Sequence, residues 1–241
     1  MAYLPLQKIL DDDLAREQAE RKERGDYWYA SEIGGCPRKA FYARKKVEGE
    51  PISPNSLRQM KAGGLAEVLV LERVADKSGL QVGEKKLVEA RREVQFNDEK
   101  LQIHGRADLV ISYDDKSQEV VECKSMNSNG FRYRDKEGKA SDHHEFQLWF
   151  YLYVAQIESG QFIYVSRDDL RMMQFPLTLS NQEVGDKVIK RIDYLNQQWA
   201  DDKIPPPLEQ EGGLCSPRWC PYYEVCKKNN QKNYGNKMDK N

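Results

Sequence analysis

The sequence predicts an α/β protein, in which helices flank a β-sheet. Segments with a helical hydrophobic period alternate along the chain with short runs rich in β-branched residues. The expected order is α, β, β, β, α, β, followed by one more strand and one more helix. The chain has 241 residues, of which 39% are hydrophobic and 32% are charged. This length and composition suit one sizeable core with a small appended lobe.

The first half of the chain supplies the opening helices and three strands. Residues 5–24 and 55–77 show the amphipathic pattern of helices, and Pro37 suits the first turn of a shorter helix between them. Three strands follow, at about 86–96, about 101–111 and about 119–124. We expect the last two strands to form a hairpin whose turn centres on Asp115.

The second half adds a helix, two strands and a final helix. We expect a polar loop at 125–142, a helix at about 143–158, and strands near 161–166 and 171–177. Ser180 and Glu183 have the capping-box spacing of a helix start. The expected divisions are an N-terminal helical segment (1–54), a core (55–204), a cysteine-rich segment (205–228) and a disordered basic tail (229–241).

The composition excludes several classes of protein. The formal net charge is -1, so any surface that binds nucleic acid has to be local. The N-terminus lacks the pattern of a signal peptide, and no apolar run approaches the roughly 20 residues of a membrane span. We therefore expect a cytoplasmic protein with no membrane partner, whose five cysteines are reduced thiols or metal ligands.

An acid and a base share one face of the strand in EVVECKS. Side chains alternate along a strand, so Glu122 and Lys124 lie on one face and Cys123 lies on the other. The expected hairpin places Asp108 opposite Glu122, with the two β-carbons about 5 Å apart. Neighbouring carboxylates are unfavourable unless a cation neutralises them, and Mg²⁺ and Mn²⁺ bind carboxylate oxygens. The alternative is an ordinary charge pair on a solvated sheet face.

The ordered motifs GRADLVI, VVECKS and QLWFY resemble the D, E-x-K and Q-x-x-x-Y motifs of RecB-like nucleases in the PD-(D/E)XK superfamily. The resemblance covers roughly residues 55–166. It implies a restriction-endonuclease-like core with a mixed central sheet flanked by helices. It also implies that Asp108 and Glu122 ligate Mg²⁺ or Mn²⁺ with the main-chain carbonyl of Cys123, and that Lys124 orients the attacking water.

The same resemblance implies roles for three residues on the helices. A further metal ligand often ends a G-x-x-x-H or G-x-x-x-E pattern, and in this chain the pattern ends at Glu67. An ordinary glutamate on a helix surface is the alternative. Gln147 and Tyr151 lie four residues apart on one helical face, where they would meet the metal site or the DNA backbone. The alternative for this pair is packing in an amphipathic core helix.

Four cysteines form a second group: Cys36, Cys215, Cys220 and Cys226. Their thiolates suit a tetrahedral Zn²⁺ site or an iron–sulfur cluster, and the spacing leaves both open. The arrangement resembles that of the iron–sulfur members of the RecB-like group, the AddB-type and the CRISPR-associated (Cas four type) exonucleases. This resemblance implies a structural 4Fe-4S cluster that joins the two ends of the chain. Four residues separate Cys215 from Cys220, where two are usual, and Zn²⁺ stays the alternative.

Basic and aromatic residues are expected to contact DNA in two segments. The helix that begins at Pro37 carries Arg38, Lys39 and Arg44. The loop after the E-x-K strand contains Phe131, Arg132, Tyr133 and Arg134. Such interleaving suits single-stranded DNA, because bases stack on aromatic rings while cations bind phosphates. The alternative is that the aromatic side chains anchor the loop to the core.

The resemblance therefore implies a metal-dependent exonuclease that acts on single-stranded DNA ends. It would act in DNA recombination and repair or in CRISPR adaptation, as a homo-oligomer or with partners from those pathways. One alternative is a noncatalytic DNA-binding adaptor of the same fold, and another is a zinc-stabilised endonuclease. The presence of Asp108, Glu122 and Lys124 together argues against the adaptor, because a module without catalysis is free to lose them.

Overall fold

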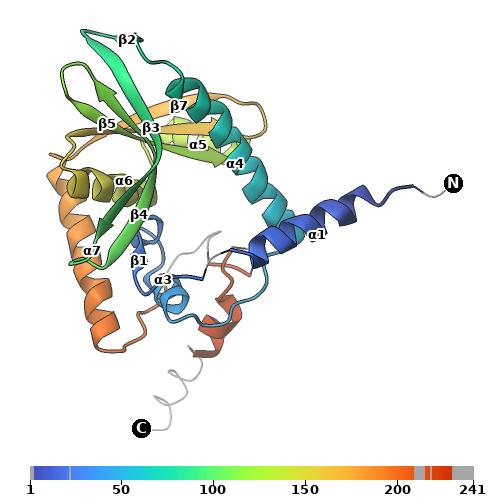
Figure 1. Cartoon of the computed structure of the whole chain (residues 1–241). Coiled ribbons are helices and arrows are strands. Elements are labelled where there is room, and N and C mark those ends of the chain that lie inside the picture. Colours follow the sequence, from blue (N-terminus) through green and yellow to red (C-terminus); the bar gives the residue numbers. More distant parts are fainter. Residues whose placement is uncertain (1–2, 22, 209–214, 218, 230–241) are drawn as a thin grey trace.

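The computed structural model describes residues 3–21, 23–208, 215–217 and 219–229, and its centre is a mixed seven-stranded sheet (Figure 1). The helices are α1 (Leu6–Ala19), α2 (Ala30–Ile33), α3 (Pro37–Arg44), α4 (Pro54–Ala75), α5 (Ser128–Glu137), α6 (Asp142–Ala155) and α7 (Gln182–Ala200). The strands are β1 (Trp28–Tyr29), β2 (Gln81–Val82), β3 (Lys85–Asp98), β4 (Ile103–Tyr113), β5 (Gln118–Met126), β6 (Ser159–Ser166) and β7 (Met172–Thr178). The α/β class predicted from the sequence is confirmed.

The sheet has the order β2-β3-β4-β5-β6-β7, in which only the β5 and β6 neighbours run parallel. β4 and β5 pair in the predicted register, with Leu109 opposite Val121. Beyond this pair the ladder ends, and the Cys123 amide N–H donates instead to the Asp108 carboxylate at 2.7 Å. The two predicted acids therefore lie where the strands separate.

β1 pairs with β4 beyond the point where the pairing of β4 with β5 ends. Trp28 and Tyr29 pair in parallel with Ile103 and His104. Trp28 is fully buried, and its indole N–H donates to the Asn196 side chain of α7 at 2.7 Å. A segment from near the N-terminus thus extends the sheet along β4, on the N-terminal side of Asp108.

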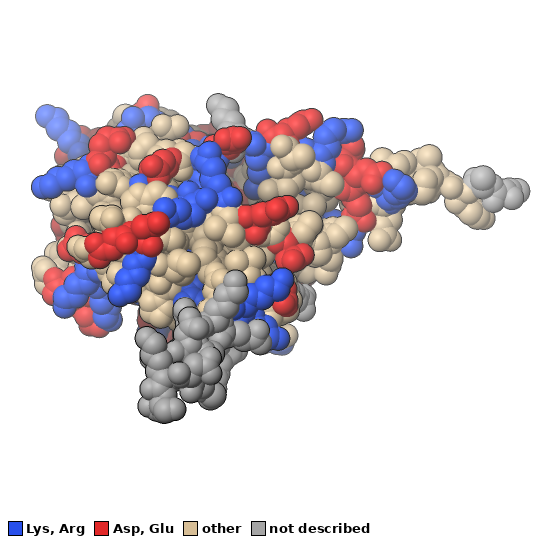
Figure 2. All heavy atoms as spheres, turned by 90° about the horizontal axis from the view of Figure 1, so that it is seen from below, with Lys and Arg blue, Asp and Glu red and all other residues tan. Residues whose placement is uncertain are grey.

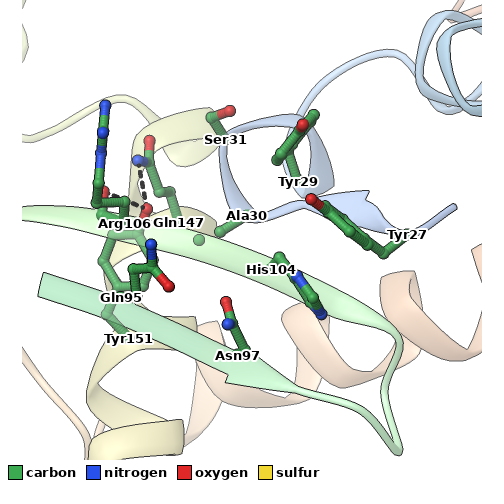
Figure 3. A pocket seen from close by; sticks show the side chains of 11 residues that line it. Tyr27, Tyr29, Ala30, Ser31, Gln95, Asn97, His104, Arg106, Gln147 and Tyr151 are labelled. Carbon is green, nitrogen blue, oxygen red and sulfur yellow. Dashed lines mark hydrogen bonds between the residues drawn. The ribbon is translucent and has the colours of Figure 1, made fainter. Parts of the chain in front are cut away.

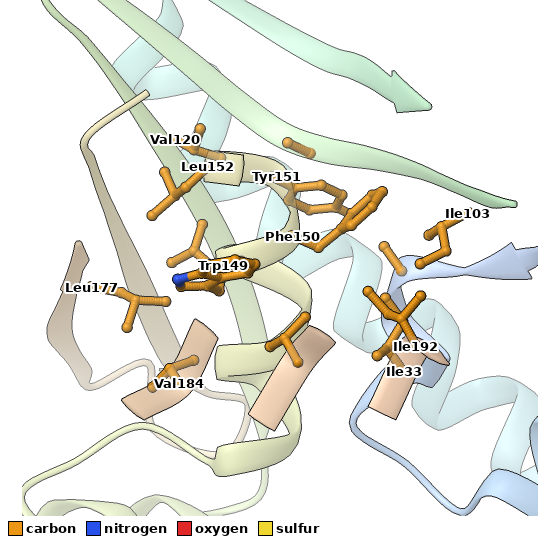
Figure 4. Close-up of a cluster of buried hydrophobic side chains, with 14 of the residues drawn as sticks. Ile33, Ile103, Val120, Trp149, Phe150, Tyr151, Leu152, Leu177, Val184 and Ile192 are labelled. Atoms are coloured by element: carbon orange, nitrogen blue, oxygen red, sulfur yellow. The ribbon is translucent and has the colours of Figure 1, made fainter. Parts of the chain in front are cut away.

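Two hydrophobic clusters cover the two faces of the sheet. The larger lies between the sheet and α6 and α7 (Figure 4), and the smaller lies between the sheet and α4. α6 is a helix with apolar side chains on nearly all sides, as expected where a helix is buried all round, and Phe150 and Leu152 in it are fully buried. Full burial of such a side chain contributes about 1.5–3 kcal/mol. The clusters fix α4 and α6 on opposite faces, and both helices reach the separated ends of β4 and β5.

The prediction of a loop at 125–142 is wrong for most of these residues, because α5 occupies the centre of the segment. The Asn127 side chain accepts from the Gly130 N–H at 2.8 Å at the start, and Gly138, with a φ of 64°, ends the helix. Serine, asparagine and glycine have low helix propensity, which explains the prediction of a loop. Phe131, only 3% exposed, anchors α5 to the body of the protein.

The predicted capping box of the last helix is also wrong. Asn181 is the N-cap of α7, and its side chain accepts from the Val184 N–H at 3.2 Å. Glu183 instead pairs with Lys187 one turn later, at 2.7 Å. Asparagine caps a helix as well as serine does, and the helix here begins one residue later than predicted.

Residues from both ends of the chain meet beside α3. The Glu50 N–H donates to the Pro221 carbonyl at 2.8 Å, and the Tyr42 and Tyr222 rings pack edge to face at 5.6 Å. The Tyr42 hydroxyl accepts from the Asn229 side chain at 2.8 Å. Apart from residue 229, the predicted basic tail lies outside the described residues. Among the described helices, none combines the length and the apolar character that crossing a membrane requires.

Candidate active site

Glu122 on β5 has only 1% of its surface exposed. Its Oε1 atom accepts hydrogen bonds from Lys124 Nζ at 2.5 Å and from Gln147 Nε2 at 2.6 Å. Its Oε2 atom is buried and has no hydrogen-bond partner among the described residues. Because buried carboxylate oxygens are normally hydrogen-bonded, Oε2 can accept a hydrogen bond or coordinate a cation.

Two more carboxylates, Asp108 and Glu67, act together with Glu122 on the charge of Lys124. Burial raises the pKa of Asp108 on β4, and burial together with the Asp108 charge raises the pKa of Glu67 on α4 to about 7. The pKa of Glu122 is also raised to about 7 by burial and by Asp108, although Lys124 opposes the rise. Carboxylates that share a site in this way favour protons or cations.

Gly63 allows α4 to approach β5 at the level of this site. A β-carbon at Gly63 would lie 2.7 Å from Ser125 Oγ, whereas a β-carbon at Gly64 would meet nothing within 4 Å. Gly63 is one helical turn before Glu67, so it lies on the same side of α4. The glycine of the predicted G-x-x-x-E pattern therefore has a physical basis, which is the close contact between helix and strand.

Lys124 is held among acids. Burial alone would lower its pKa, but the carboxylates of Glu122, Asp108 and Glu67 outweigh that effect and raise the pKa above its ordinary value. Lys124 therefore stays charged at neutral pH. Its side chain is 22% exposed.

Gln147 and Tyr151 lie on one face of α6, as predicted, and both are buried. Gln147 Nε2 donates to Glu122 and also to the Tyr151 hydroxyl, at 3.0 Å. The Tyr151 hydroxyl in turn donates to the main-chain carbonyl of Arg106 at 3.1 Å (Figure 3). This chain of hydrogen bonds ties the Glu122 carboxylate to the backbone of β4.

Cys123, His143 and His144 lie near the site, and their chemistry differs from that of the acids. The Cys123 side chain packs in the cluster under α4, as predicted, and burial raises the pKa of its thiol to about 12. Burial lowers the pKa of His143, and lowers that of His144 to about 2. His144 Nδ1 lies 2.7 Å from the Tyr164 hydroxyl. All three groups are therefore neutral at physiological pH.

Comparisons with known proteins identify the family. Residues 47–227 match the PD-(D/E)XK nuclease superfamily, which is three quarters of the chain. The chain belongs to this superfamily. The family predicted from the motifs is confirmed.

This PD-(D/E)XK nuclease is 25% identical over 190 residues to the CRISPR-associated exonuclease Cas4 of Saccharolobus solfataricus, a match that covers 78% of this chain and 82% of the relative. Its fold is similar to the crystal structure of SSO0001, with a TM-score of 0.56 and 19% identity, over 92% of this chain and 96% of that one. An alkaline exonuclease from Laribacter hongkongensis matches with a TM-score of 0.47 and 14% identity, over 79% of this chain and 98% of that one.

Nucleases of this superfamily use divalent metal ions. As they stand, no three acidic, histidine or cysteine side chains among the described residues are gathered closely enough to hold an ion. The donor chemistry nevertheless suits such an ion, because Glu67, Asp108 and Glu122 supply hard oxygen ligands. Glu122 Oε2, which is buried without a partner among the described residues, is the clearest of these donors.

None of the four predicted cluster cysteines of this nuclease forms a disulfide bond within the described residues. Cys36 is the N-cap of α3, and Arg38 Nη1 donates to Cys226 Sγ at 3.4 Å. The pKa of Cys215 is raised by burial first, and then by the charges of Cys226 and Cys36. The thiol-bearing segments from the two ends of the chain are thus neighbours, whereas the cluster itself stays a prediction.

The predicted contact of Arg38 and Arg44 with DNA is wrong, because both side chains are buried, with 5% of each residue exposed. Arg38 Nε donates to the Pro205 carbonyl at 2.6 Å. Arg44 bonds to Asp26 and to Gln102, and its guanidinium lies over both the Trp28 and the Trp199 ring. These arginines therefore join the ends of the chain, and only Lys39 of the predicted set is exposed.

The aromatic and basic residues of α5 also differ in burial, and only some of them are exposed. Phe131 is buried in the core, which excludes it from the predicted stacking on bases, whereas Tyr133 is 54% exposed and Arg132 lies on the surface. The Arg134 guanidinium lies over the Tyr133 ring, 4.6 Å from its centroid. On the face shown in Figure 2, lysines and arginines alternate with aspartates and glutamates. That face therefore shows no single large basic area among its described residues.

Sequence reasoning named the Cys123 carbonyl but missed two other main-chain groups of the site. The Cys123 N–H holds Asp108, and the Arg106 carbonyl holds Tyr151. Backbone groups leave no trace in residue types, so only the strand register gives a signal for them. Sequence reasoning also assigned no role to β1, which pairs with β4 a few residues before Asp108.

Proposed function

We propose that this chain hydrolyses phosphodiester bonds in DNA with the help of Mg²⁺ or Mn²⁺. The observation that carries the proposal is the environment of Glu122, whose one oxygen is held by Lys124 and Gln147. The other oxygen is buried and has no partner in the described part of the chain. A carboxylate that is fixed on one side and unbonded on the other suits a metal ligand that must keep its orientation.

The roles of the site residues follow from their contacts. Asp108, Glu122, Glu67 and the main-chain carbonyl of Cys123 would hold the ion. When bound, the ion lowers the pKa of a coordinated water and polarises the phosphate. Lys124 is charged because the neighbouring carboxylates raise its pKa, so its ammonium orients the attacking water and stabilises negative charge on the phosphate.

Gln147 and Tyr151 position the site rather than react. Gln147 fixes the rotamer of Glu122, and Tyr151 fixes Gln147 through a second hydrogen bond. Because Tyr151 is itself anchored on the Arg106 carbonyl, the orientation of Glu122 is coupled to the backbone of β4.

Within this activity we propose an exonuclease that acts on single-stranded DNA ends. The relative named CRISPR-associated exonuclease Cas4 supports this choice, since the match spans most of both chains. We propose partners of the same kind as in the sequence analysis, namely copies of this chain or proteins of recombination or CRISPR adaptation. The exposed Arg132, Tyr133 and Lys39 are the members of the predicted DNA-binding set that remain available to DNA.

We also propose that residues 1–54 and 205–228 form one lobe on a core of residues 55–204. Its support is the set of contacts between the chain ends, in which Glu50 bonds to Pro221 and Arg38 bonds to Pro205 and Cys226. Cys36, Cys215, Cys220 and Cys226 would hold a structural 4Fe-4S cluster there, with Zn²⁺ as the alternative.

One experiment tests the nuclease proposal. End-labelled single- and double-stranded DNA, linear and circular, is incubated with Mn²⁺ and with the wild type, Glu122→Ala or Glu89→Ala. Glu89 is an exposed glutamate on β3 and serves as the matched control. We expect the wild type and Glu89→Ala to degrade linear single strands, and Glu122→Ala to leave them intact.

Each other outcome corrects a stated part of the proposal. Cleavage of closed circles would overturn the exonuclease assignment and leave the nuclease. Equal activity in Glu122→Ala would overturn the assignment of the site. Intact DNA in every reaction with the wild type would overturn the nuclease activity itself.

The cluster has its own test, which does not depend on cleavage. We expect protein purified without oxygen to be brown, to contain iron and sulfide, and to lose the visible absorbance in Cys36→Ala. Colourless protein with one zinc per chain would overturn the iron–sulfur cluster in favour of Zn²⁺.

A further inference from the structure

A pocket of about 340 Å³ lies next to the candidate active site (Figure 3). It is bounded by β1, by the start of α2, by the paired strands β3 and β4, and by Gln147 and Tyr151 of α6. It occupies the place along β4 between the last residue paired with β5, Leu109, and the residues paired with β1. The pocket therefore adjoins the candidate active site, because Gln147 lines the pocket and also contacts Glu122.

One side of this pocket is aromatic. The Tyr27 ring stacks on the His104 ring with centroids 3.7 Å apart and an angle of 18° between the planes. The Tyr29 ring meets Tyr27 edge to face at 5.4 Å. His104 is held in place because its Nε2 atom lies 2.9 Å from the Glu99 carboxylate. Flat rings fixed in this way are a surface on which a planar, aromatic ligand stacks.

The opposite side carries polar groups with unused hydrogen-bonding capacity. The Gln95 and Asn97 side chains are exposed on β3 and make no hydrogen bonds within the described part of the chain. Each amide presents one acceptor and two donors in a plane, which is the pattern that pairs with the edge of a nucleobase. In Figure 3 these amides lie across the pocket from the Tyr27 and Tyr29 rings.

The charges around the pocket argue against a phosphate as its occupant. Arg106 pairs with Glu93 at 2.6 Å, and Arg24, which lies over the Tyr29 ring, pairs with both oxygens of Glu32 at 2.7 Å. Both guanidinium groups are therefore neutralised by carboxylates. A flat and uncharged ligand with hydrogen-bonding edges agrees better with this lining than an anion does.

We propose that this pocket binds one unpaired nucleobase of the DNA strand, next to the phosphate that is cleaved. The inference rests on the proposed nuclease function and adds the recognition of a base to it. Gln147 lines the pocket and also donates to Glu122, so the base and the catalytic carboxylate contact the same side chain. The volume is at the lower end of the range for small-molecule sites, about 300–1,000 Å³, which suits a single nucleotide.

The pocket has a consequence for the choice of substrate. A base in a duplex has to leave its stack and its partner before it enters, which costs a few kcal/mol, whereas a base at a single-stranded end is already free. The pocket thus favours unpaired ends, and it does so without a large basic surface.

The test removes one base of the DNA strand at a time. A series of short single-stranded oligonucleotides carries one abasic site at successive positions, and each is compared with the intact strand. We expect one position, beside the cleaved phosphate, at which removal of the base lowers kcat/KM with Mn²⁺ and weakens binding with Ca²⁺, each about tenfold. The same series is measured with a Gln95→Ala, Asn97→Ala double variant and with Tyr27→Ala.

The decisive result is the coupling between base and pocket. In Tyr27→Ala and in the double variant, removal of that base should have little further effect, because the contact is already lost. Tyr27→Phe keeps the ring and should keep the sensitivity, which separates stacking from misfolding. Gln81→Ala, an exposed amide on β2 at the other end of β3, is the matched control and should behave as the wild type.

The outcomes separate this inference from the proposed function. If the wild type cleaves DNA and no abasic position matters, or if the variants keep the full sensitivity, the pocket inference is overturned and the nuclease stands. If the wild type cleaves nothing, the nuclease proposal fails, and the coupling measured on binding with Ca²⁺ still decides whether the pocket holds a base.

Discussion

Gln147 donates one side-chain hydrogen bond to Glu122 and another to Tyr151, so a single amide connects the buried acid to the helix that faces it. We expect Gln147→Ala to lower cleavage about 10- to 100-fold, the usual effect of losing a group that orients a metal ligand. Because Glu122 loses its orientation, the Mn²⁺ concentration for half-maximal activity should also rise. A Mn²⁺ titration of cleavage checks both effects.

Gln182→Ala is the control for this variant, since Gln182 is an exposed amide on α7 that bonds to Asp186 one turn later. If Gln147→Ala keeps the Mn²⁺ dependence of the wild type, Gln147 has no positioning role.

Lys124 is the charged group closest to Glu122 and is predicted to act on the phosphate. We expect Lys124→Ala to slow cleavage about 100- to 1,000-fold, as the loss of one fixed donor to a developing charge does in other enzymes. Asp108→Ala should abolish cleavage, because it removes a metal ligand. Both variants should keep the circular dichroism spectrum of the wild type. Lys100→Ala, in the turn before β4, should stay active, and full activity of Lys124→Ala would refute the role of Lys124.

The raised pKa values of Glu67 and Glu122, about 7 in place of 4.5, predict how the stability of the metal-free protein depends on pH. A carboxyl group with a raised pKa in the folded state binds its proton more tightly there than in the unfolded chain. Its contribution to stability is complete below about pH 4.5 and is lost as the pH rises through about 7. The contribution of Glu67 and Glu122 to the melting temperature without metal should therefore fall between about pH 4.5 and about pH 7.

The matched variant is Glu67→Gln, which removes one of these titrations and should flatten the fall. Added Mn²⁺ should raise the melting temperature more at pH 8 than at pH 6, because protons and the metal ion compete for the same oxygens. The same pH dependence of the melting temperature in the wild type and in Glu67→Gln would contradict the raised pKa of Glu67.

Gly63 and Gly64 are adjacent glycines in α4 with different surroundings. Gly64→Ala should stabilise the protein by up to about 1 kcal/mol, because alanine favours a helix and its β-carbon meets nothing within 4 Å. Gly63→Ala should lose that gain, since its β-carbon would lie 2.7 Å from Ser125 Oγ. Urea unfolding measures both changes. The effect at Gly63 should shrink in a Ser125→Ala background, and equal stability of the two single variants would exclude the contact.

Arg44 and Lys39 lie on the same helix, but Arg44 is buried and Lys39 is exposed. Arg44→Gln should lower the free energy of unfolding by about 1.5–3 kcal/mol, because it removes hydrogen bonds to Asp26 and Gln102 from a charged donor. Lys39→Ala should leave stability unchanged and weaken DNA binding with a smaller dependence on salt. The opposite pattern, with DNA binding lost in a fully stable Arg44→Gln, would restore the prediction from sequence.

Much of the fold was predictable because the determining signals are local. The alternation in EVVECKS and a turn at Asp115 fixed the faces and register of β5 against β4, and the structure pairs Leu109 with Val121 as that register requires. The motif order then indicated the superfamily. These inferences need only neighbouring residues and the period of a strand.

Long-range packing explains what the sequence did not predict. Arg38 and Arg44 look like a basic helix face, and only the contacts of α3 with Pro205 and Trp199 show that they are buried. α5 begins with residues that favour a loop, and a buried Phe131 stabilises the helix regardless. β1, which pairs with β4, has only two residues, and such a short strand has no sequence pattern that would predict it.

The place of β1 in the sheet has a consequence for the order in which the protein folds. β3, β4 and β5 follow one another along the chain, so the hairpins that bring Asp108 and Glu122 together close short loops and are expected to form early. β1 joins β4 only after a much longer loop has closed, and it carries Tyr27 and Tyr29 with it. A folding intermediate should therefore hold its acids in place before it has a site for a base.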